Sequence, residues 1–553
     1  MDSNYTHIDK KEWGKLIQLF ISPEDEDSRA TLVQHMGQIL FGLQDFLKKN
    51  VGVTEEISLL KISKSFQDTI INEKPKNRMA EVITEIIEDI APQAVNVSSP
   101  YFIGHMTSAI PFFMVHLKSI VAALNQNVVK LETSKVVSHI ERQVIAKLHR
   151  IIFEKSESFY RKHVQSITTT LGVFTEGGTA ANMTALWVAR NTLLKPRNSF
   201  KGIEREGLLK AYQEYGIQRS VVLVSKRGHY SLRKVSGILG IGNENVLPIE
   251  IDSDHRIDLD HLKSTISDLQ KKKTAVIAVV GIAGATETGS IDPLEEISDI
   301  CKKNNIHFHV DAAWGGPTIL SDKYKNLLKG IELADSVTID CHKQFYMPMS
   351  CGIVLFKDPE HMEAVEYHAN YIIRQGSVDL GIKSFAGSRE AHSLILDSSL
   401  KILGKNGYSM LIDHGIELAK DFANEINKRD NFQLITKPVL NILTYRYCPK
   451  VMQNELKTSD HESSLEINEI LNEINISLQR LQREAGNSFV SRTEFVDPNY
   501  SDVKNVVLRS VLMNPLTNIE ILNNILDEQE SLVKESDEII AQYKKLNIKE
   551  DLV

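Results

Sequence analysis

The stretch SVTIDCHKQF, residues 336–345, decides how the rest of the sequence is interpreted. Its first half, with Val337 and Ile339 among small polar residues, predicts a strand buried in a sheet. That strand runs directly into His342 and Lys343. An amine carried to the end of a buried strand indicates a functional site at that edge of the sheet.

Further apolar runs of this kind occur between residues 96 and 390, with helical segments such as DPLEEISDICKKNN (292–305) between them. Strands buried on both faces are near-continuously apolar. The alternation predicts an α/β fold, with a mostly parallel sheet covered by helices and with ligands outside the carboxyl ends of the strands. The predicted strands are SVVLVS (220–225), TAVIAVVG (274–281), IHFHVDAA (306–313), DSVTID (335–340) and GIVLF (352–356).

Composition limits the class of protein. With 553 residues, 42% of them apolar and 25% charged, the chain is expected to be globular and to form more than one domain. Its net charge of −8 provides no basic field for nucleic acid or an anionic membrane. The N-terminus lacks the order of a signal peptide, and no apolar run approaches the roughly 20 residues that span a bilayer. We therefore expect a cytoplasmic protein.

Four cysteines are too few for a disulfide scaffold in a chain of this length, and their spacing does not indicate zinc. We expect reduced thiols and no metal. These cysteines are Cys301, Cys341, Cys351 and Cys448.

The sequence divides into three expected regions. Residues 1–95 show helical periodicity, residues 96–400 contain the predicted parallel sheet, and residues 401–553 suggest a smaller α+β domain. The run NVVLRSVLM (505–513) predicts a strand in the third region, and the polar residues 450–465 predict an exposed loop.

Chemically distinctive residues follow several predicted strands. Asp311 follows IHFHV, His229 and Ser231 follow SVVLVS, and Thr179 follows TEGG at an expected helix start. Glycine and a small hydroxyl at a helix N-terminus favour an anion, because free N–H groups and the helix dipole point at it. A carboxylate such as Asp311 between an apolar strand and small residues needs a cationic partner.

Pyridoxal 5′-phosphate requires this set of groups together. Its phosphate suits a helix N-terminus, its ring stacks on an imidazole, its protonated pyridine nitrogen needs a carboxylate, and its aldehyde condenses with a lysine amine. Taken singly, a His-Lys pair, a glycine turn and an aspartate after a strand are ordinary surface features or caps. Their joint occurrence in this order predicts a pyridoxal-phosphate enzyme.

Four of these stretches resemble the group II pyridoxal-phosphate-dependent amino-acid decarboxylases. They are FTEGGTAANMTALWVARN (174–191), SKRGHYSLRKVSGILGIG (225–242), HFHVDAAWGG (307–316) and ADSVTIDCHK (334–343). The resemblance covers roughly residues 95–530. It implies the aspartate-aminotransferase type of fold, fold type I, and a homodimer with active sites at the interface and the N-terminal helices wrapped on the partner.

Other stretches resemble the bacterial pyridoxal-dependent aspartate 1-decarboxylases. This narrower resemblance implies α-decarboxylation of L-aspartate to β-alanine and carbon dioxide, a supply for coenzyme A synthesis. A glutamate decarboxylase giving γ-aminobutyrate, another carbon–carbon lyase and a non-catalytic assembly protein stay open as alternatives. The stretches are SSPYFIGHMTSAIPFFM (98–114), LNQNVVKLETSKVVSHIERQVIAKLHRIIF (124–153), YIIRQGSVDLG (371–381) and SFVSRTEF (488–495).

The resemblance also assigns roles to residues. It implies that Lys343 bonds covalently to the cofactor, that Asp311 pairs with the pyridine nitrogen, and that His229 stacks on the ring with Ala313 on its other face. Further implied cofactor contacts are Gly178, Thr179 and His342 at the phosphate and Thr286 near the ring hydroxyl. On the substrate, Arg509 would bind the α-carboxylate, and His105 and Thr107 would lie near the side chain. Arg389 would be structural.

One departure concerns proton return to the substrate Cα. Several members of the family use a tyrosine on a mobile loop after the lysine. The corresponding loop here, IIRQGSVDLGIKSFAGSR (372–389), contains no tyrosine, and Tyr371 precedes it. Another group, such as His229 or Lys343, is left as the proton donor, unless protonation occurs elsewhere and abortive transamination is more frequent.

Overall fold

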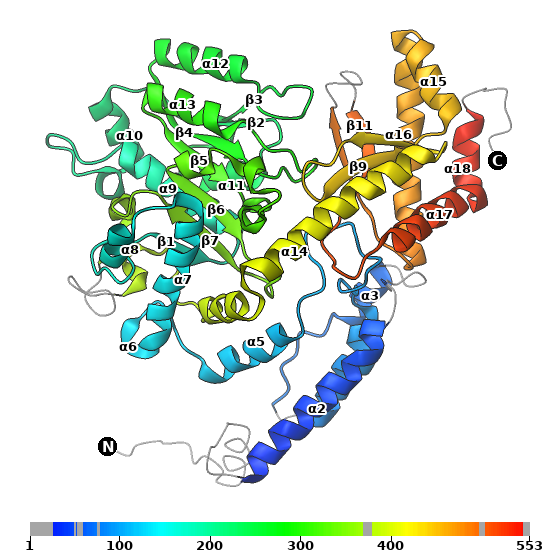
Figure 1. Cartoon of the computed structure of the whole chain (residues 1–553), viewed down its shortest axis with the longest axis horizontal. Coiled ribbons are helices and arrows are strands. Elements are labelled where there is room, and N and C mark those ends of the chain that lie inside the picture. Colours follow the sequence, from blue (N-terminus) through cyan, green and yellow to red (C-terminus); the bar gives the residue numbers. More distant parts are fainter. Residues whose placement is uncertain are drawn as a thin grey trace.

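The computed structural model describes residues 26–48, 51, 59–73, 78–368, 379–496 and 504–545. A large domain built on a seven-stranded sheet lies beside a smaller one with a four-stranded sheet. The long helix α14 (His392–Lys428) runs between them (Figure 1). Among the described helices, none has the length and apolar character that crossing a membrane requires.

The large sheet has the strand order β1-β7-β6-β5-β4-β2-β3. Neighbours from β6 to β3 pair in parallel, while β7 runs antiparallel to both β1 and β6. The predicted strands and the mostly parallel sheet are confirmed. The strands are β1 (Gly172–Thr175), β2 (Arg219–Ser225), β3 (Val246–Ile249), β4 (Thr274–Ile282), β5 (His307–Asp311), β6 (Ser336–Asp340) and β7 (Gly352–Phe356).

Helices cover both faces of this sheet because successive strand residues point to opposite sides. Val222 and Val224 of β2 pack with α9 (Gly178–Leu193) and α11 (Ser231–Ile238), while Val221 and Leu223 belong to the core on the other face. That second core receives α7 (Val136–Phe153), α12 (Leu259–Lys271) and α13 (Leu294–Asn304). Other helices of this domain are α5 (Phe113–Leu124), α6 (Leu131–Ser134), α8 (Glu157–His163) and α10 (Ile203–Tyr215).

Short 3-10 turns complete the large domain. They are η3 (Asn243–Asn245), η4 (Gly316–Leu320), η5 (Lys325–Leu328), η6 (Ile331–Leu333), η7 (His361–Val365) and η8 (Leu380–Lys383).

The small domain packs helices on an antiparallel sheet of order β10-β11-β9-β8. The helices and the sheet share a core that includes Leu508, Tyr445 and Leu471. The predicted strand at 505–513 is confirmed as β11. The elements are β8 (Phe432–Thr436), β9 (Ile442–Tyr447), α15 (Lys450–Thr458), α16 (His461–Ala485), β10 (Ser491–Val496), β11 (Lys504–Val511), α17 (Ile519–Glu535) and α18 (Asp537–Lys544).

The expectation of an exposed loop at 450–465 is wrong. The segment forms α15 and the start of α16. Met452 is fully buried in the small-domain core and Leu456, four residues on, packs against it, so two apolar side chains at helical spacing anchor α15. The Asp460 carboxylate accepts a hydrogen bond from the Ser463 N–H and caps α16.

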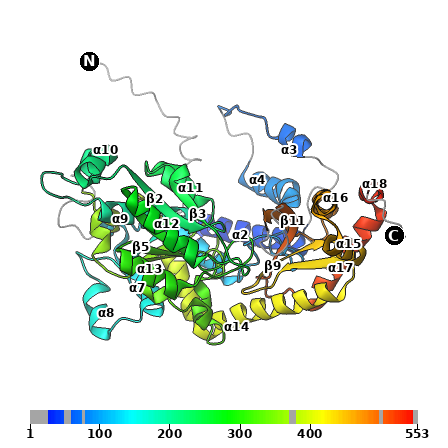
Figure 2. The same cartoon turned by 90° about the horizontal axis from the view of Figure 1, so that it is seen from above.

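The predicted N-terminal helices are present as α2 (Glu26–Lys48), α3 (Leu59–Ser65) and α4 (Met79–Glu85), with the turns η1 (Ile86–Ile90) and η2 (Ala91–Gln93). Helix α2 extends away from the large domain at the bottom of Figure 1, and in the view from above it lies between the two sheets (Figure 2). The expected boundary at residue 400 falls inside α14, close to Gly404, whose φ of 63° interrupts the helix. The division into three regions stays a prediction.

Candidate active site

A cavity of about 500 Å³ collects the residues that the sequence singled out. It lies at the carboxyl ends of β4, β5 and β6, where a parallel sheet is expected to bind ligands. Thr107 is absent from the lining, but its Oγ1 lies 3.2 Å from Nδ1 of His105. The predicted residues that line the cavity are His105, Gly178, Thr179, His229, Thr286, Asp311, Ala313, His342, Lys343 and Arg509.

Asp311 and Lys343 come from neighbouring strands of the large sheet. Asp311 ends β5, which pairs in parallel with β6, and Lys343 follows the end of β6. The Asp311 carboxylate is 7% exposed. It accepts hydrogen bonds from the Ala313 N–H at 3.2 Å and from Nδ2 of Asn182 at 2.9 Å. It is therefore a fixed, partly satisfied acceptor at the cavity wall.

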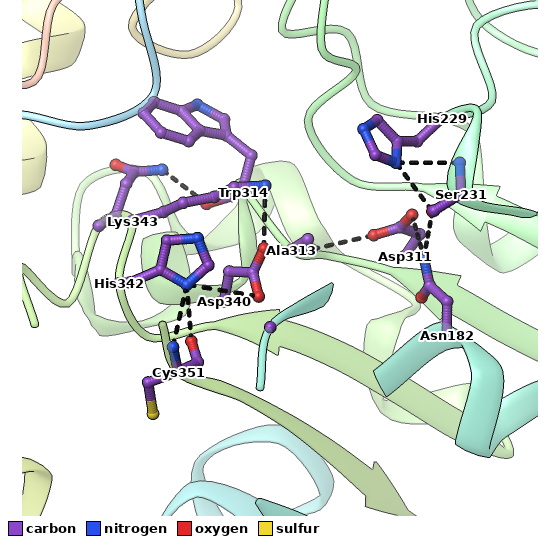
Figure 3. A network of polar contacts seen from close by, with 12 residues as sticks. Asn182, His229, Ser231, Asp311, Ala313, Trp314, Asp340, His342, Lys343 and Cys351 are labelled. Carbon is purple, nitrogen blue, oxygen red and sulfur yellow. Dashed lines mark hydrogen bonds and ion pairs between the residues drawn. The ribbon is translucent and has the colours of Figure 1, made fainter. Parts of the chain in front are cut away.

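Lys343 forms an ion pair inside the cavity. Its Nζ lies 3.0 Å from Oδ2 of Asp340, whose side chain is 5% exposed. His342, beside them, donates from Nδ1 to the Cys351 carbonyl at 2.9 Å. Figure 3 shows Lys343, His342 and Asp340 on one side of Ala313 and His229 with Asp311 on the other. The amine and the acid thus flank a small side chain.

The N-terminus of α9 lies where the sequence predicted an anion site. Gly177 has a φ of 120°, and a Cβ on Gly178 would lie 2.8 Å from Oδ2 of Asp340, so both positions require glycine. The first helical hydrogen bond joins the Ala181 N–H to the Gly177 carbonyl. The N–H groups of residues 178–180 precede it and are free for a phosphate.

His229 has the character of a neutral stacking ring. Burial lowers its pKa, and the charge of Asp311 opposes this shift only in part. Its Nδ1 accepts hydrogen bonds from the Ser231 hydroxyl at 2.8 Å and from the Ser231 N–H at 3.3 Å. The remaining proton is therefore on Nε2, and the ring plane is fixed.

Arg509 of β11 brings a guanidinium from the small domain. It donates to the Thr286 carbonyl at 3.0 Å, the Gly104 carbonyl at 3.1 Å and Oγ of Ser491 at 3.1 Å. Five N–H groups are present on a guanidinium, so donors are left for a carboxylate in the cavity. Partial desolvation and the charges of Arg509, Lys343 and His342 lower the pKa of His105, which favours its neutral form.

Arg389, which the resemblance implied to be structural, is not part of the cavity lining. Its guanidinium contacts both carboxylate oxygens of Glu141, at 2.7 and 2.6 Å, and both side chains are almost completely buried.

The cavity residues that were not predicted from the sequence include Asn182, Arg227 and Asp340. Asn182 lies inside α9, where no local pattern marks it. Arg227 is held by the Val496 carbonyl and His255, and its guanidinium lies over the Phe495 ring. For Asp340 a signal existed, since it ends a buried strand as Asp311 does.

The cavity fits pyridoxal phosphate in its chemistry. It provides an amine, a carboxylate, a stacking imidazole and a helix N-terminus, one for each polar or planar part of that molecule. Oδ1 of Asp340 is buried and has no hydrogen-bond partner among the described residues, so the site carries an acceptor that a donor group of a ligand would satisfy.

Comparisons with known proteins agree with this chemistry. Residues 63–448 match the model of the pyridoxal-dependent decarboxylase conserved domain. The chain is 45% identical over 522 residues to aspartate 1-decarboxylase of Aliivibrio fischeri (strain ATCC 700601 / ES114), covering 94% of this chain and 95% of that one. It is 28% identical to L-2,4-diaminobutyrate decarboxylase of Acinetobacter baumannii, covering 77% and 82%. The crystal structure of mouse CSAD superposes with a TM-score of 0.78 at 22% identity, covering 91% and 99%.

Proposed function

The chain belongs to the pyridoxal-dependent decarboxylase family, and from this premise we propose that it converts L-aspartate to β-alanine and carbon dioxide. Membership makes it a pyridoxal-phosphate enzyme of fold type I. The substrate rests on one observation, the 45% identity to an aspartate 1-decarboxylase over 94% of this chain. Supply of β-alanine for coenzyme A synthesis is the role that follows.

The cavity residues would hold the cofactor in the roles that the sequence suggested. Lys343 would bond to it covalently, Asp311 would pair with the ring nitrogen, and His229 and Ala313 would contact the two ring faces. Gly178, Thr179 and His342 would contact the phosphate, and Thr286 the ring hydroxyl. When bound, pyridoxal phosphate supplies a protonated ring that accepts the electron pair left by carbon dioxide.

Arg509 would orient the substrate through its α-carboxylate. Its three contacts fix the guanidinium plane, so the carboxylate that leaves is held in one direction. His105 and Thr107 share a hydrogen bond at 3.2 Å, which leaves one of their two protons to donate to the side-chain carboxylate. Aspartate carries two carboxylates, and this arrangement offers donors for both.

Lys343 would return the proton to the substrate Cα. Burial lowers the pKa of His229, which makes it a poor donor near neutral pH. Once the substrate amine has displaced it from the cofactor, the Lys343 amine, whose Nζ lies 3.0 Å from Oδ2 of Asp340 in this structure, would carry a proton in the same cavity. Tyr371 and residues 372–378 of the loop lie outside the described residues, and residues 379–389 contain no tyrosine.

We further propose a cytoplasmic homodimer in which the N-terminal region, residues 1–95, packs on the partner. Several large apolar side chains of α2 and of the entry to α5 are exposed in the single chain, including Val33, Phe41 and Phe112. All four cysteines are free and buried, as expected in a reducing compartment. Light scattering of the purified chain tests the dimer, and a monomeric mass would contradict it.

The function is tested by the cofactor spectrum and by the amines formed from a mixture of all the amino acids, for the wild type and Lys343→Ala. The expected result is a near-visible cofactor band that is lost in Lys343→Ala, with β-alanine as the main product. γ-Aminobutyrate would instead indicate a glutamate decarboxylase, since one methylene changes selectivity by only about 1–3 kcal/mol. A cofactor band without any amine product would support the cofactor assignment and contradict the decarboxylase function.

A further inference from the structure

A chain of buried hydrogen bonds leads away from Asp311 through the large domain. Oδ2 of Asp311 contacts Nδ2 of Asn182 at 2.9 Å, and Oδ1 of Asn182 contacts Nε2 of His309 at 3.1 Å. Nδ1 of His309 lies 2.8 Å from the Ser336 hydroxyl, which lies 2.8 Å from Nε2 of His307. The chain therefore joins α9, β5 and β6 behind the cavity.

The acceptors in this chain fix the direction of every bond. A carboxylate only accepts, so the amide of Asn182 must turn Nδ2 to Asp311 and Oδ1 to His309. His309 must then donate from Nε2, which leaves Nδ1 to accept from the Ser336 hydroxyl. Ser336 in turn accepts from Nε2 of His307. All the donors point toward Asp311.

The environment of the histidines agrees with this direction. His309, Ser336 and Asn182 are at most 1% exposed. Burial lowers the pKa of His309 and brings that of His307 well below its ordinary value, so each ring carries one proton. The Thr338 hydroxyl lies 3.5 Å from Nε2 of His309, farther than Oδ1 of Asn182.

Asn182 also reaches the other side of the cavity. Its Nδ2 lies 3.4 Å from Oγ of Ser231, and the Ser231 hydroxyl donates to Nδ1 of His229 (Figure 3). One amide thus contacts both Asp311, which would pair with the cofactor ring nitrogen, and the Ser231 hydroxyl, which orients the His229 imidazole.

We propose that Asn182 and His309 are positioning residues for Asp311. They hold Asp311 as a charged hydrogen-bond acceptor, so that the proton shared between Asp311 and the cofactor ring nitrogen stays on the ring nitrogen. Hydrogen bonds donated to a carboxylate favour its ionised form, and donors that are themselves polarised strengthen the effect. Without them, the shared proton moves toward the carboxylate. The inference rests on the proposed pairing of Asp311 with the ring nitrogen.

The test uses the full chain reconstituted with pyridoxal phosphate carrying 15N in the ring. The 15N chemical shift reports whether the ring nitrogen is protonated, and titration of the apoenzyme gives the cofactor dissociation constant. The variants are His309→Phe, Asn182→Leu, Asp311→Ala and the milder Ser336→Ala, which removes one hydroxyl. The matched control is His149→Phe. His149 is also a fully buried histidine, but its hydrogen bonds go to Tyr160 and the Phe356 carbonyl, which are not part of the hydrogen-bonded series that ends at Asp311.

In His309→Phe and Asn182→Leu, the shift is expected to move toward that of neutral pyridine, with an increase of about tenfold or more in the dissociation constant. Ser336→Ala is expected to give an intermediate shift, and His149→Phe the wild-type values. A shift that changes only in Asp311→Ala would overturn the inference and leave the role of Asp311 intact. A protonated ring nitrogen in Asp311→Ala would overturn that role, and the inference with it.

Discussion

Nζ of Lys343 lies 3.0 Å from Oδ2 of Asp340, so a carboxylate three residues earlier holds the amine that the cofactor requires. Asp340 ends β6 beside the N-terminus of α9, where a Cβ on Gly178 would come within 2.8 Å of it. Gly178 therefore leaves room for the Asp340 carboxylate, in addition to its place at the predicted anion site. The pair places a charged amine in the cavity before any ligand binds.

Asp340→Asn is expected to lower kcat by about tenfold to a hundredfold, because the amide keeps the shape of the side chain but removes the charge that pairs with Lys343, the proposed proton donor. Proton return to Cα should then fail more often, and abortive transamination should rise. The measurement is kcat together with the pyridoxamine phosphate formed per β-alanine. Asp358→Asn, at an exposed loop position, is the control. An unchanged ratio and kcat would show that Asp340 takes no part in proton return.

Arg509→Lys is expected to lower kcat/KM for aspartate by about tenfold to a hundredfold, which corresponds to one hydrogen bond to a charged group. A lysine cannot satisfy Thr286, Ser491 and Gly104 and still present a planar pair of donors to a carboxylate. Steady-state kinetics with varied aspartate measures the change. Arg492→Lys is a matched control on β10, because Arg492 is exposed. Equal losses in both variants would contradict a role specific to Arg509.

Much of the site could be predicted from the sequence because its residues follow strands. Asp311 and Lys343 come after apolar runs whose burial is evident, and parallel strands bring their carboxyl ends to one edge. The glycine and hydroxyl at the start of α9 carry a local signal for the same reason. In each case, the position along the chain determines the position in space.

Asn182 could not be predicted in this way, because its role depends on β5 packing against the second turn of α9. Helix α15 was missed for a related reason. Its sequence is mostly polar, and the helix is fixed by Met452, which fills the core of a domain formed by residues far away in the chain. Tertiary contacts decide both features, and local patterns do not contain them.

The stability of the protein is expected to fall as the pH is lowered below about 6.5. Burial lowers the pKa of His149 to about 3, so between pH 6.5 and 3 the unfolded chain binds a proton there that the native protein does not. In this window, His149 reduces the free energy of unfolding by about 1.4 kcal/mol for each pH unit by which the pH is lowered. Denaturation at several pH values, compared with His149→Phe, measures the slope. The variant should have the shallower slope, and parallel slopes would contradict the assignment.

The last prediction concerns the buried pair of Arg389 and Glu141. Arg389→Met is expected to reduce the free energy of unfolding by about 3–5 kcal/mol, because it leaves a carboxylate buried without its cation. Arg389→Met with Glu141→Leu is expected to recover most of this loss, since the desolvation cost of both charges disappears together. Chemical denaturation of the two single variants and the double variant gives the coupling.

The cofactor band separates a structural role from a catalytic one. If Arg389 only supports packing, the folded double variant should retain the cofactor band and the kcat of the wild type, because neither Arg389 nor Glu141 lines the cavity. A double variant that regains stability but loses the band would show that this pair acts on the cofactor site from a distance.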